Sequence, residues 1–168
     1  MTLAPVLEAI QTLTDKIKSY DKSIERLAES KYPETARLRQ VKGVGPLTAL
    51  AFRLTIDDPS RFEKSRDVGP FLGLVPRRDQ SGSMDKQLHI TKAGNRYLRR
   101  LLVGCAQYIL GPFGEDCDLR RHGETIAARG GKNAKRRAVV AVARKLAVLL
   151  HRLWVSGEAY EPLRNHAS

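Results

Sequence analysis

A short polar segment, RRDQSGSMDKQ (residues 77–87), places two serines and a glycine among basic side chains. A serine hydroxyl attacks a phosphodiester only when its proton is removed and the charge developing on the phosphate is stabilised. Phosphoryl transfer depends most on the second requirement, which cationic side chains meet. The cations near Ser81 in sequence are Arg77, Arg78, Lys86, Lys92 and Arg96. These residue types therefore suit a segment that holds and attacks a phosphate.

The same segment lacks an evident general base. Asp79 and Asp85 flank the serines, but acids beside basic residues are ordinary in turns. Ser81 followed by Gly82 is also a common turn sequence, so the residues alone leave open whether Ser81 is a turn residue or a nucleophile. The four histidines and two cysteines are scattered without metal-ligand spacing, so we expect no metal site in this chain.

The charge balance indicates the class of partner. The chain of 168 residues carries 30 Lys and Arg against 18 Asp and Glu, a net charge of +12. Such a surface attracts polyanions, so nucleic acid is the leading partner, ahead of an anionic membrane or a merely soluble basic scaffold. No apolar run approaches the roughly 20 residues that span a bilayer, and the N-terminal segment lacks a basic stretch followed by the apolar stretch of a signal peptide. We therefore expect a cytoplasmic protein without membrane contact.

A glycine-rich turn, KGVGP, follows a short apolar helical pattern and precedes a longer one. Gly43 and Gly45 can adopt backbone angles closed to other residues, and Pro46 suits the first position of a helix. Free N–H groups at such a helix start can grip a phosphate. The turn resembles a helix-hairpin-helix motif, which binds the DNA backbone without sequence preference. In that resemblance Gly43, Val44 and Gly45 meet a phosphate.

The N-terminal segment, residues 1–36, has a helical pattern that Pro33 ends. Its apolar residues recur by alternating steps of four and three, which is an a/d pattern sustained for about three heptads. They are Val6, Ile10, Leu13, Ile17, Tyr20, Ile24 and Leu27. This pattern fits two alternatives. The segment is either a coiled coil, through which the protein self-associates, or an amphipathic helix packed on its own domain.

The rest of the chain, a domain at residues 37–162 and a tail at 163–168, also reads as helical. Thr91 is expected to cap a helix whose apolar stripe runs from Leu98 to Ile109, with Arg96, Arg99 and Arg100 together on another face. A last long helix is expected at residues 133–155, its cations on a solvated face. Residues 77–87 are expected to form an exposed loop. No pair of strands stands out, so the predicted fold class is all-α.

Four segments, VKGVGPLTALAF, FLGLVPRRDQSGS, ITKAGNRYLRRLL and GKNAKRRAVVAVARKL, occur in this order between residues 41 and 146. Together they resemble the C-terminal domain of the insertion-sequence "one-ten" family, the DEDD or bridge-RNA-guided transposases. The likeness covers roughly residues 38–161, and the preceding helix resembles the coiled-coil arm of that family.

The resemblance implies that Ser81 is the nucleophile that forms a covalent phosphoserine link to DNA, with Ser83 as the nearby alternative. It implies DNA and a structured guide RNA as partners, held by Gly43, Val44, Gly45, Arg77, Arg78, Lys86, Lys92, Arg96, Arg99 and Arg100. It also implies an N-terminal RuvC-like domain that binds Mg²⁺, of which nothing is seen before Met1. We therefore expect no cofactor in this chain, no recombination by this chain alone, and a bacterial, nucleoid-associated location. A non-catalytic nucleic-acid-binding module, or a decayed transposase, is the alternative.

Overall fold

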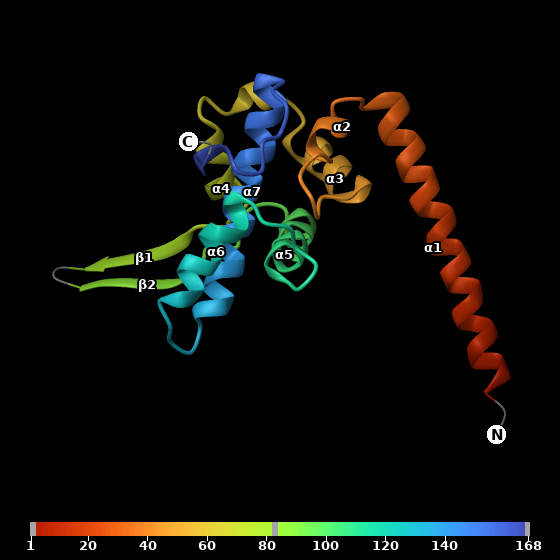
Figure 1. Ribbon diagram of the computed structural model, residues 1–168, viewed down its shortest axis with the longest axis horizontal. Helices are drawn as coiled ribbons and strands as arrows, with labels where there is room; N and C mark the ends of the chain where they lie inside the picture. Colours follow the sequence, from red (N-terminus) through yellow and green to blue (C-terminus); the bar gives the residue numbers. More distant parts are fainter. Residues whose placement is uncertain (1–2, 82–83, 167–168) are drawn as a thin grey trace.

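The computed structural model describes residues 3–81 and 84–166, and for residues 78–88 it describes the backbone alone. Three parts are visible in Figure 1: a long N-terminal helix that stands away as an arm, a helical body, and a two-stranded hairpin that projects from the body. The arm is α1 (Ala4–Lys31) and the hairpin is formed by β1 (Pro76–Ser81) and β2 (Met84–Ile90). No helix in the described part is long and apolar enough to cross a membrane.

The body is built around α7 (Ala134–Ser156), which packs against α5 (Arg96–Leu110), α6 (Asp118–Ala128), α4 (Val68–Phe71) and α2 (Thr35–Leu38). Val142, Leu146 and Leu150 of α7 are fully buried, because apolar residues four apart fall on one face of a helix. Ala143 and Ala147 let neighbouring helices approach closely. The predicted last helix and the all-α class of the body are confirmed.

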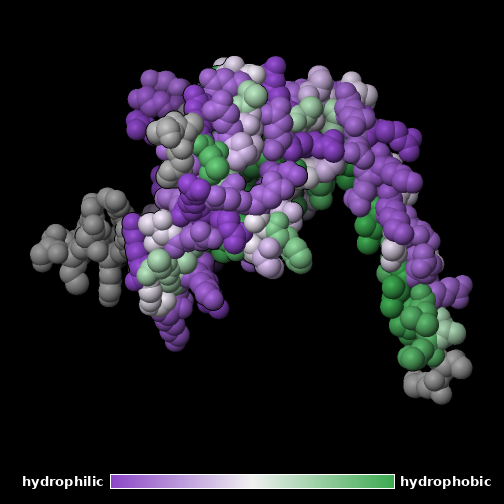
Figure 2. Space-filling view, in the orientation of Figure 1, coloured by the Kyte–Doolittle hydropathy of each residue, from purple (hydrophilic) through white to green (hydrophobic). Residues whose placement is uncertain are grey.

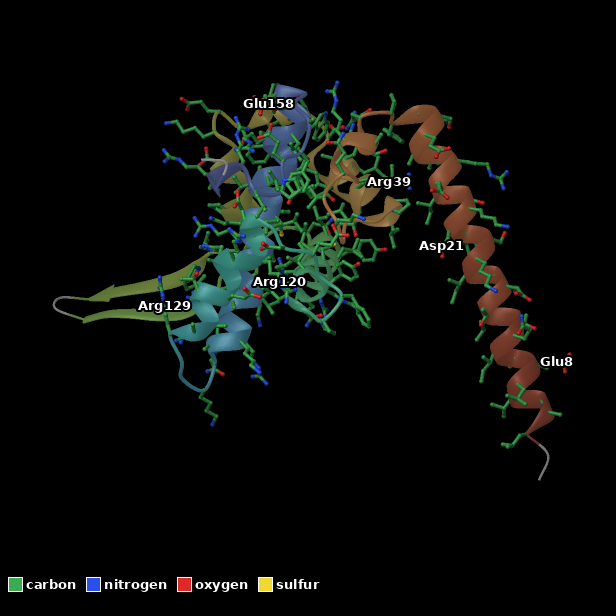
Figure 3. The ribbon with its side chains drawn as sticks, in the orientation of Figure 1. Glu8, Asp21, Arg39, Arg120, Arg129 and Glu158 are labelled. Carbon is green, nitrogen blue, oxygen red and sulfur yellow. The ribbon has the colours of Figure 1, made fainter. Side chains whose placement is uncertain are left out.

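The arm α1 ends one residue before Tyr32 and two before Pro33, as its sequence predicts. Two ion pairs attach its C-terminal end to the body. Arg39 binds Glu25 at 2.9 Å and reaches from the body toward α1 (Figure 3). Arg53 of α3 (Pro46–Ile56) pairs with Glu34 just after the helix. The part of α1 that precedes Glu25 extends beyond these contacts, and Ala28 is the one described residue of α1 that is buried.

The segment between α3 and the hairpin contains two short 3₁₀ turns, η1 (Pro59–Arg61) and η2 (Ser65–Asp67), before α4. Buried His151 of α7 holds both turns. Its Nε2 lies 2.9 Å from the Pro59 carbonyl, which can only accept, so Nε2 carries the proton. Nδ1 lies 2.9 Å from the Ser65 hydroxyl oxygen. This segment therefore packs on α7 through both ring nitrogens of one buried histidine.

The prediction of an irregular loop at residues 77–87 is wrong, because β1 and β2 form an antiparallel hairpin there. Its register pairs Pro76 with Ile90 and Ser81 with Met84, with one irregularity between Pro76 and Arg78. The sequence PRRDQS lacks the apolar alternation by which half-buried strands are found. The strands contact each other along their length through this ladder.

The helix that follows the hairpin begins later than predicted. Asn95, not Thr91, is its N-cap, and the Asn95 side chain accepts from the Leu98 N–H at 2.9 Å. Lys92 and Gly94 have positive φ angles of 57° and 71°, which no helix can include. The predicted stripe is confirmed, since Leu98 and Ile109 are buried along with the residues between them on that face.

The C-terminal segment crosses the start of α6. The Asp118 N–H donates to the Pro162 carbonyl at 2.8 Å, and the Asn165 N–H donates to the Asp118 carboxylate at 3.0 Å. Cys117 caps α6 and is buried beneath Tyr160, and burial raises the pKa of the Tyr160 hydroxyl. Cys105 is also buried, and burial raises the pKa of its thiol, as fits a core residue.

Candidate nucleic-acid interface

The hairpin carries the segment singled out for chemistry. Ser81 is the last residue of β1, directly before the connection, and the backbone of Lys86 pairs with that of Asp79. Arg77, near the base of the hairpin, is exposed. Gly82 and Ser83 lie outside the described residues, as do the side chains of Ser81, Arg78 and Lys86. The fold therefore places the backbone of Ser81 at the end of a projecting strand.

Two glycines allow the chain to cross itself at the base of the hairpin. A Cβ on Gly73 would lie 2.3 Å from the Ala93 nitrogen, and one on Gly94 would lie 2.1 Å from the Phe71 carbonyl oxygen. The Lys92 N–H donates to the Gly73 carbonyl at 3.2 Å, which closes the crossing. Exposed Lys92 therefore lies where the hairpin meets the body.

Arg99 fixes this crossing from inside. Its side chain is only 9% exposed, and its Nη1 donates to the Leu72 carbonyl at 3.0 Å and to the Ala93 carbonyl at 2.6 Å. The prediction that Arg99 shares an outer face with Arg96 and Arg100 is wrong. A step of three residues in a 3.6-residue period turns it toward the body. Its guanidinium donates to two backbone carbonyls, that of Leu72 before β1 and that of Ala93 after β2.

Arg96 and Arg100 are one turn apart on α5 and both are exposed. No described carboxylate forms an ion pair with either of them, whereas Arg120 and Arg121 are paired with Glu124 and Asp116. The sequence of α5, RYLRRLLVGCAQYIL, contains no acidic residue. Its outer face is therefore a strip of uncompensated positive charge that starts at the base of the hairpin.

The glycine-rich turn lies at the other end of α5. Gly43 has φ of 93°, and a Cβ there would lie 2.8 Å from Cδ1 of Tyr108, near the C-terminal end of α5. Val44 is buried and its N–H donates to the Val41 carbonyl at 3.0 Å, so it offers no free donor. Gly45 is the N-cap of α3, is exposed, and has open space where a side chain would be.

The start of α3 leaves N–H groups unused within the helix. The first bond of the helix runs from the Ala49 N–H to the Gly45 carbonyl at 3.0 Å, so the N–H groups of Leu47 and Thr48 precede it. Together with the open position at Gly45, they suit the approach of a phosphate. The structure thus places the turn against the C-terminal end of α5 and the hairpin base against its N-terminal end, although these segments are far apart in sequence.

A second basic group lies at the connection of α6 and α7. Gly130 and Gly131 have positive φ angles of 73° and 92°, and the Arg137 guanidinium donates to the Gly130 carbonyl at 3.1 Å. The exposed cations there are Arg129, Lys132, Lys135, Arg136 and Arg137. Figure 3 shows Arg129 at the end of α6. The predicted exposure of the α7 cations is confirmed.

Within the described ranges, no three His, Cys, Asp or Glu side chains lie close enough to hold a metal ion.

The outer face of α5 also carries exposed aromatic residues, which the sequence analysis did not single out. Tyr97 and Tyr108 are 53% and 45% exposed on α5, and Phe113 follows α5. Their helical spacing of 11 residues, about three full turns, was the signal that places both tyrosines on one face.

Comparison with known proteins shows that the sequence is similar to transposases. Residues 35–114 match the model of the transposase IS116/IS110/IS902 family. Over 147 residues the chain is 33% identical to the transposase for insertion sequence element IS1111A of Coxiella burnetii, covering 87% of this chain and 39% of that protein. It is 41% identical over 75 residues to the transposase for element IS1328 of Yersinia enterocolitica, covering 44% of this chain and 22% of that protein.

It is also 29% identical over 110 residues to the pilin gene-inverting protein of Moraxella lacunata, covering 65% of this chain and 33% of that protein. The chain spans less than half the length of each of these three relatives. The family match includes both the glycine-rich turn and the hairpin with Ser81, and the resemblance inferred from the ordered motifs is confirmed. Through its residues 35–114, the chain belongs to the transposase IS116/IS110/IS902 family.

Proposed function

We propose that this chain is the part of a DNA transposase that supplies a serine nucleophile, Ser81, and holds the DNA phosphates around it. The observation that carries the proposal is the family match across residues 35–114, which contains Ser81 at the end of a strand that projects from the body. A residue in that place can reach into a bound duplex while the body remains outside. The surrounding strip of cations supports the same reading.

The proposed step is a phosphoryl transfer. The Ser81 oxygen forms a bond to a DNA phosphorus, the bond from that phosphorus to one deoxyribose oxygen breaks, and the hydroxyl proton passes to a base. The departing deoxyribose oxygen takes a proton and becomes a free hydroxyl. One phosphorus–oxygen bond breaks and one forms, so the phosphate remains a diester in which serine replaces one sugar. A second attack by a free DNA hydroxyl on the phosphoserine then rejoins strands. Cations lower the barrier by stabilising charge on the phosphate.

The base and the metal are proposed to come from elsewhere. An acidic RuvC-like domain carrying Mg²⁺, in the same polypeptide or in a partner, would activate the serine and the leaving oxygen. Besides the serine, the proposed contribution of this chain is positioning, because Arg99 and the glycine crossing hold the hairpin base against the body. A structured guide RNA is the further proposed partner, and the positive surface at the α6–α7 connection suits its phosphates.

The phosphate-holding residues are proposed from exposure and placement. Lys92, Arg96 and Arg100 follow one another from the hairpin base along α5, and Gly45 offers the open helix start at the far end. Arg77, Arg78 and Lys86 are proposed to act on the hairpin itself. Gly43 and Val44 shape the turn. Arg99 is proposed as a positioning residue, since its guanidinium already serves two carbonyls.

Self-association is proposed to run through α1. Five of its seven heptad residues, Val6, Ile10, Leu13, Ile17 and Tyr20, are 55% to 70% exposed. Figure 2 shows the resulting apolar surface along the free part of the arm. An a/d stripe of this length is stable in water when a second helix covers it, and a second copy carries the complementary stripe.

The direct test supplies the RuvC-like domain in trans with Mg²⁺ and labelled donor DNA, and measures covalent protein–DNA adduct on a denaturing gel. We expect Ser81→Ala to abolish the adduct and Ser83→Ala to retain it. Ser81→Cys is the matched variant, because it keeps a nucleophile in place and should give an adduct of altered stability. An unchanged adduct yield in Ser81→Ala would rule out the proposed role.

A second candidate function is nucleic-acid binding without catalysis, favoured by the cationic and aromatic face of α5. It predicts salt-dependent binding to DNA and RNA but no adduct under any supply of the acidic domain. The same gel separates the two functions. Replacing Arg96 and Arg100 together should weaken binding in either case, and unchanged binding would mean that this face is only solvated.

A further inference from the structure

The outer face of α5 combines flat aromatic rings with positive charge. Tyr97 and Tyr108 are 53% and 45% exposed, although large aromatic side chains usually lose most of their surface to the core. They are 11 residues apart, so at 100° per residue they differ by only about 20° around the helix and lie about 17 Å apart along it. Arg100 lies between them along the helix, and its charge is unmatched by any described carboxylate.

Gly104 completes this face. It lies midway between Arg100 and Tyr108, is exposed, and would meet nothing within 4 Å if it carried a Cβ. Glycine inside a helix destabilises the helix relative to alanine. At Gly104 no neighbouring atom explains the glycine, because a side chain there would meet nothing within 4 Å. The glycine leaves a shallow, open place between the two rings where another molecule can come close to the helix backbone.

We propose that the face formed by Tyr97, Arg100, Gly104 and Tyr108, here called the stacking face, binds an unpaired stretch of DNA. The tyrosine rings stack on bases, Arg100 binds the intervening phosphate, and the strand passes close to α5 over Gly104. Aromatic side chains alternating with cations are the arrangement by which proteins hold single strands. The distance between the rings suits a span of a few nucleotides, and the absence of acids from α5 matches the charge of a strand.

The proposal rests on the proposed function for the choice of DNA. The relatives are named for a transposase and a gene-inverting protein. A strand that passes from one duplex to another must first lose its base pairs there, so an exchange of strands would present unpaired DNA. The stacking face begins at the base of the hairpin, where Arg96 follows the crossing at Lys92 and Gly94. A strand opened near Ser81 would reach the stacking face by running along the hairpin to its base.

The test measures fluorescence anisotropy of labelled oligothymidylate of about 12 nucleotides, beside a blunt duplex of the same length, with the full chain. We expect Tyr97→Leu to weaken oligothymidylate binding about tenfold, because it removes a stacking ring. Tyr97→Phe keeps the ring and should leave affinity nearly unchanged. The slope of log affinity against log salt should stay the same in Tyr97→Leu and fall in Arg100→Gln, which removes a phosphate contact.

Gly104→Gln distinguishes binding from stability. Glutamine is the better helix former, so the variant should melt at a higher temperature, and its side chain should block the strand and weaken oligothymidylate binding. Equal affinities of Tyr97→Leu, Gly104→Gln and the parent for oligothymidylate would overturn the proposal, as would oligouridylate binding more tightly than oligothymidylate. These outcomes leave the Ser81 adduct test untouched, so failure of the stacking face and failure of the proposed function are separable.

Discussion

Replacing Arg99 by methionine tests the inference that this arginine holds the base of the hairpin. Methionine fills similar space without donors, so the Leu72 and Ala93 carbonyls lose hydrogen bonds of 3.0 and 2.6 Å from a charged group. Hydrogen bonds to charged groups contribute about 1.5–3 kcal/mol each. Ala93 is exposed, so water can replace part of its loss, whereas the Leu72 side is buried. We therefore expect the free energy of unfolding to fall by about 3 kcal/mol.

The assay is urea unfolding followed through the fluorescence of Trp154, the one tryptophan of the chain, which packs 4.9 Å from the Arg53 guanidinium. The slope against urea should be unchanged, since the same surface unfolds. Arg100→Met is the matched control on the exposed face and should change stability by less than about 0.5 kcal/mol. Equal effects of Arg99→Met and Arg100→Met would refute the reasoning.

Amide hydrogen exchange localises the same effect. The Thr91 N–H donates to the Val75 carbonyl at 2.9 Å, and the Lys92 N–H donates to the Gly73 carbonyl at 3.2 Å. Both amides should lose protection in Arg99→Met by more than amides at the centre of α7, because the crossing opens locally. A uniform loss of protection throughout the body would mean that Arg99 supports the whole core rather than the hairpin base.

Three further predictions follow from packing, titration and exposure. In urea unfolding, Gly43→Ala should lower the free energy of unfolding by about 2 kcal/mol, because Gly43 has a positive φ and lies against Tyr108. Gly45→Ala is the control and should have little effect, because a side chain there would enter open space. Burial, Lys145 and Arg129 lower the pKa of His122 below 6.5, so the unfolded state binds the proton more readily. Stability should fall as pH drops through about 6.5, and less so in His122→Gln. Ile10→Asp with Ile17→Asp should yield monomers in sedimentation without loss of core stability, whereas unchanged oligomers would exclude the arm as the contact.

The helices α1, α3, α5 and α7 were predictable because their apolar residues follow the helical period, whereas α6 was not predicted. The start of α3 at Pro46 and the end of α7 near Ser156 follow from local signals that act within a few residues. The hairpin was not predictable in this way, because the sequence of β1, PRRDQS, does not alternate between apolar and polar residues. The start of α5 was placed too early, since only the chain crossing at Gly73 and Gly94 shows that residues 91–94 bend back across the hairpin base.

The sequence by itself determined the helical class, the heptad pattern of the arm, the basic charge and the family, since each depends on residue type and spacing along one chain. Tertiary structure alone decided which arginines are available. Arg96, Arg99 and Arg100 look equivalent in sequence, yet Arg99 turns inward to two carbonyls that belong to distant segments. The close approach of Gly43 to Tyr108 likewise exists only after folding, because it depends on residues far apart in the chain.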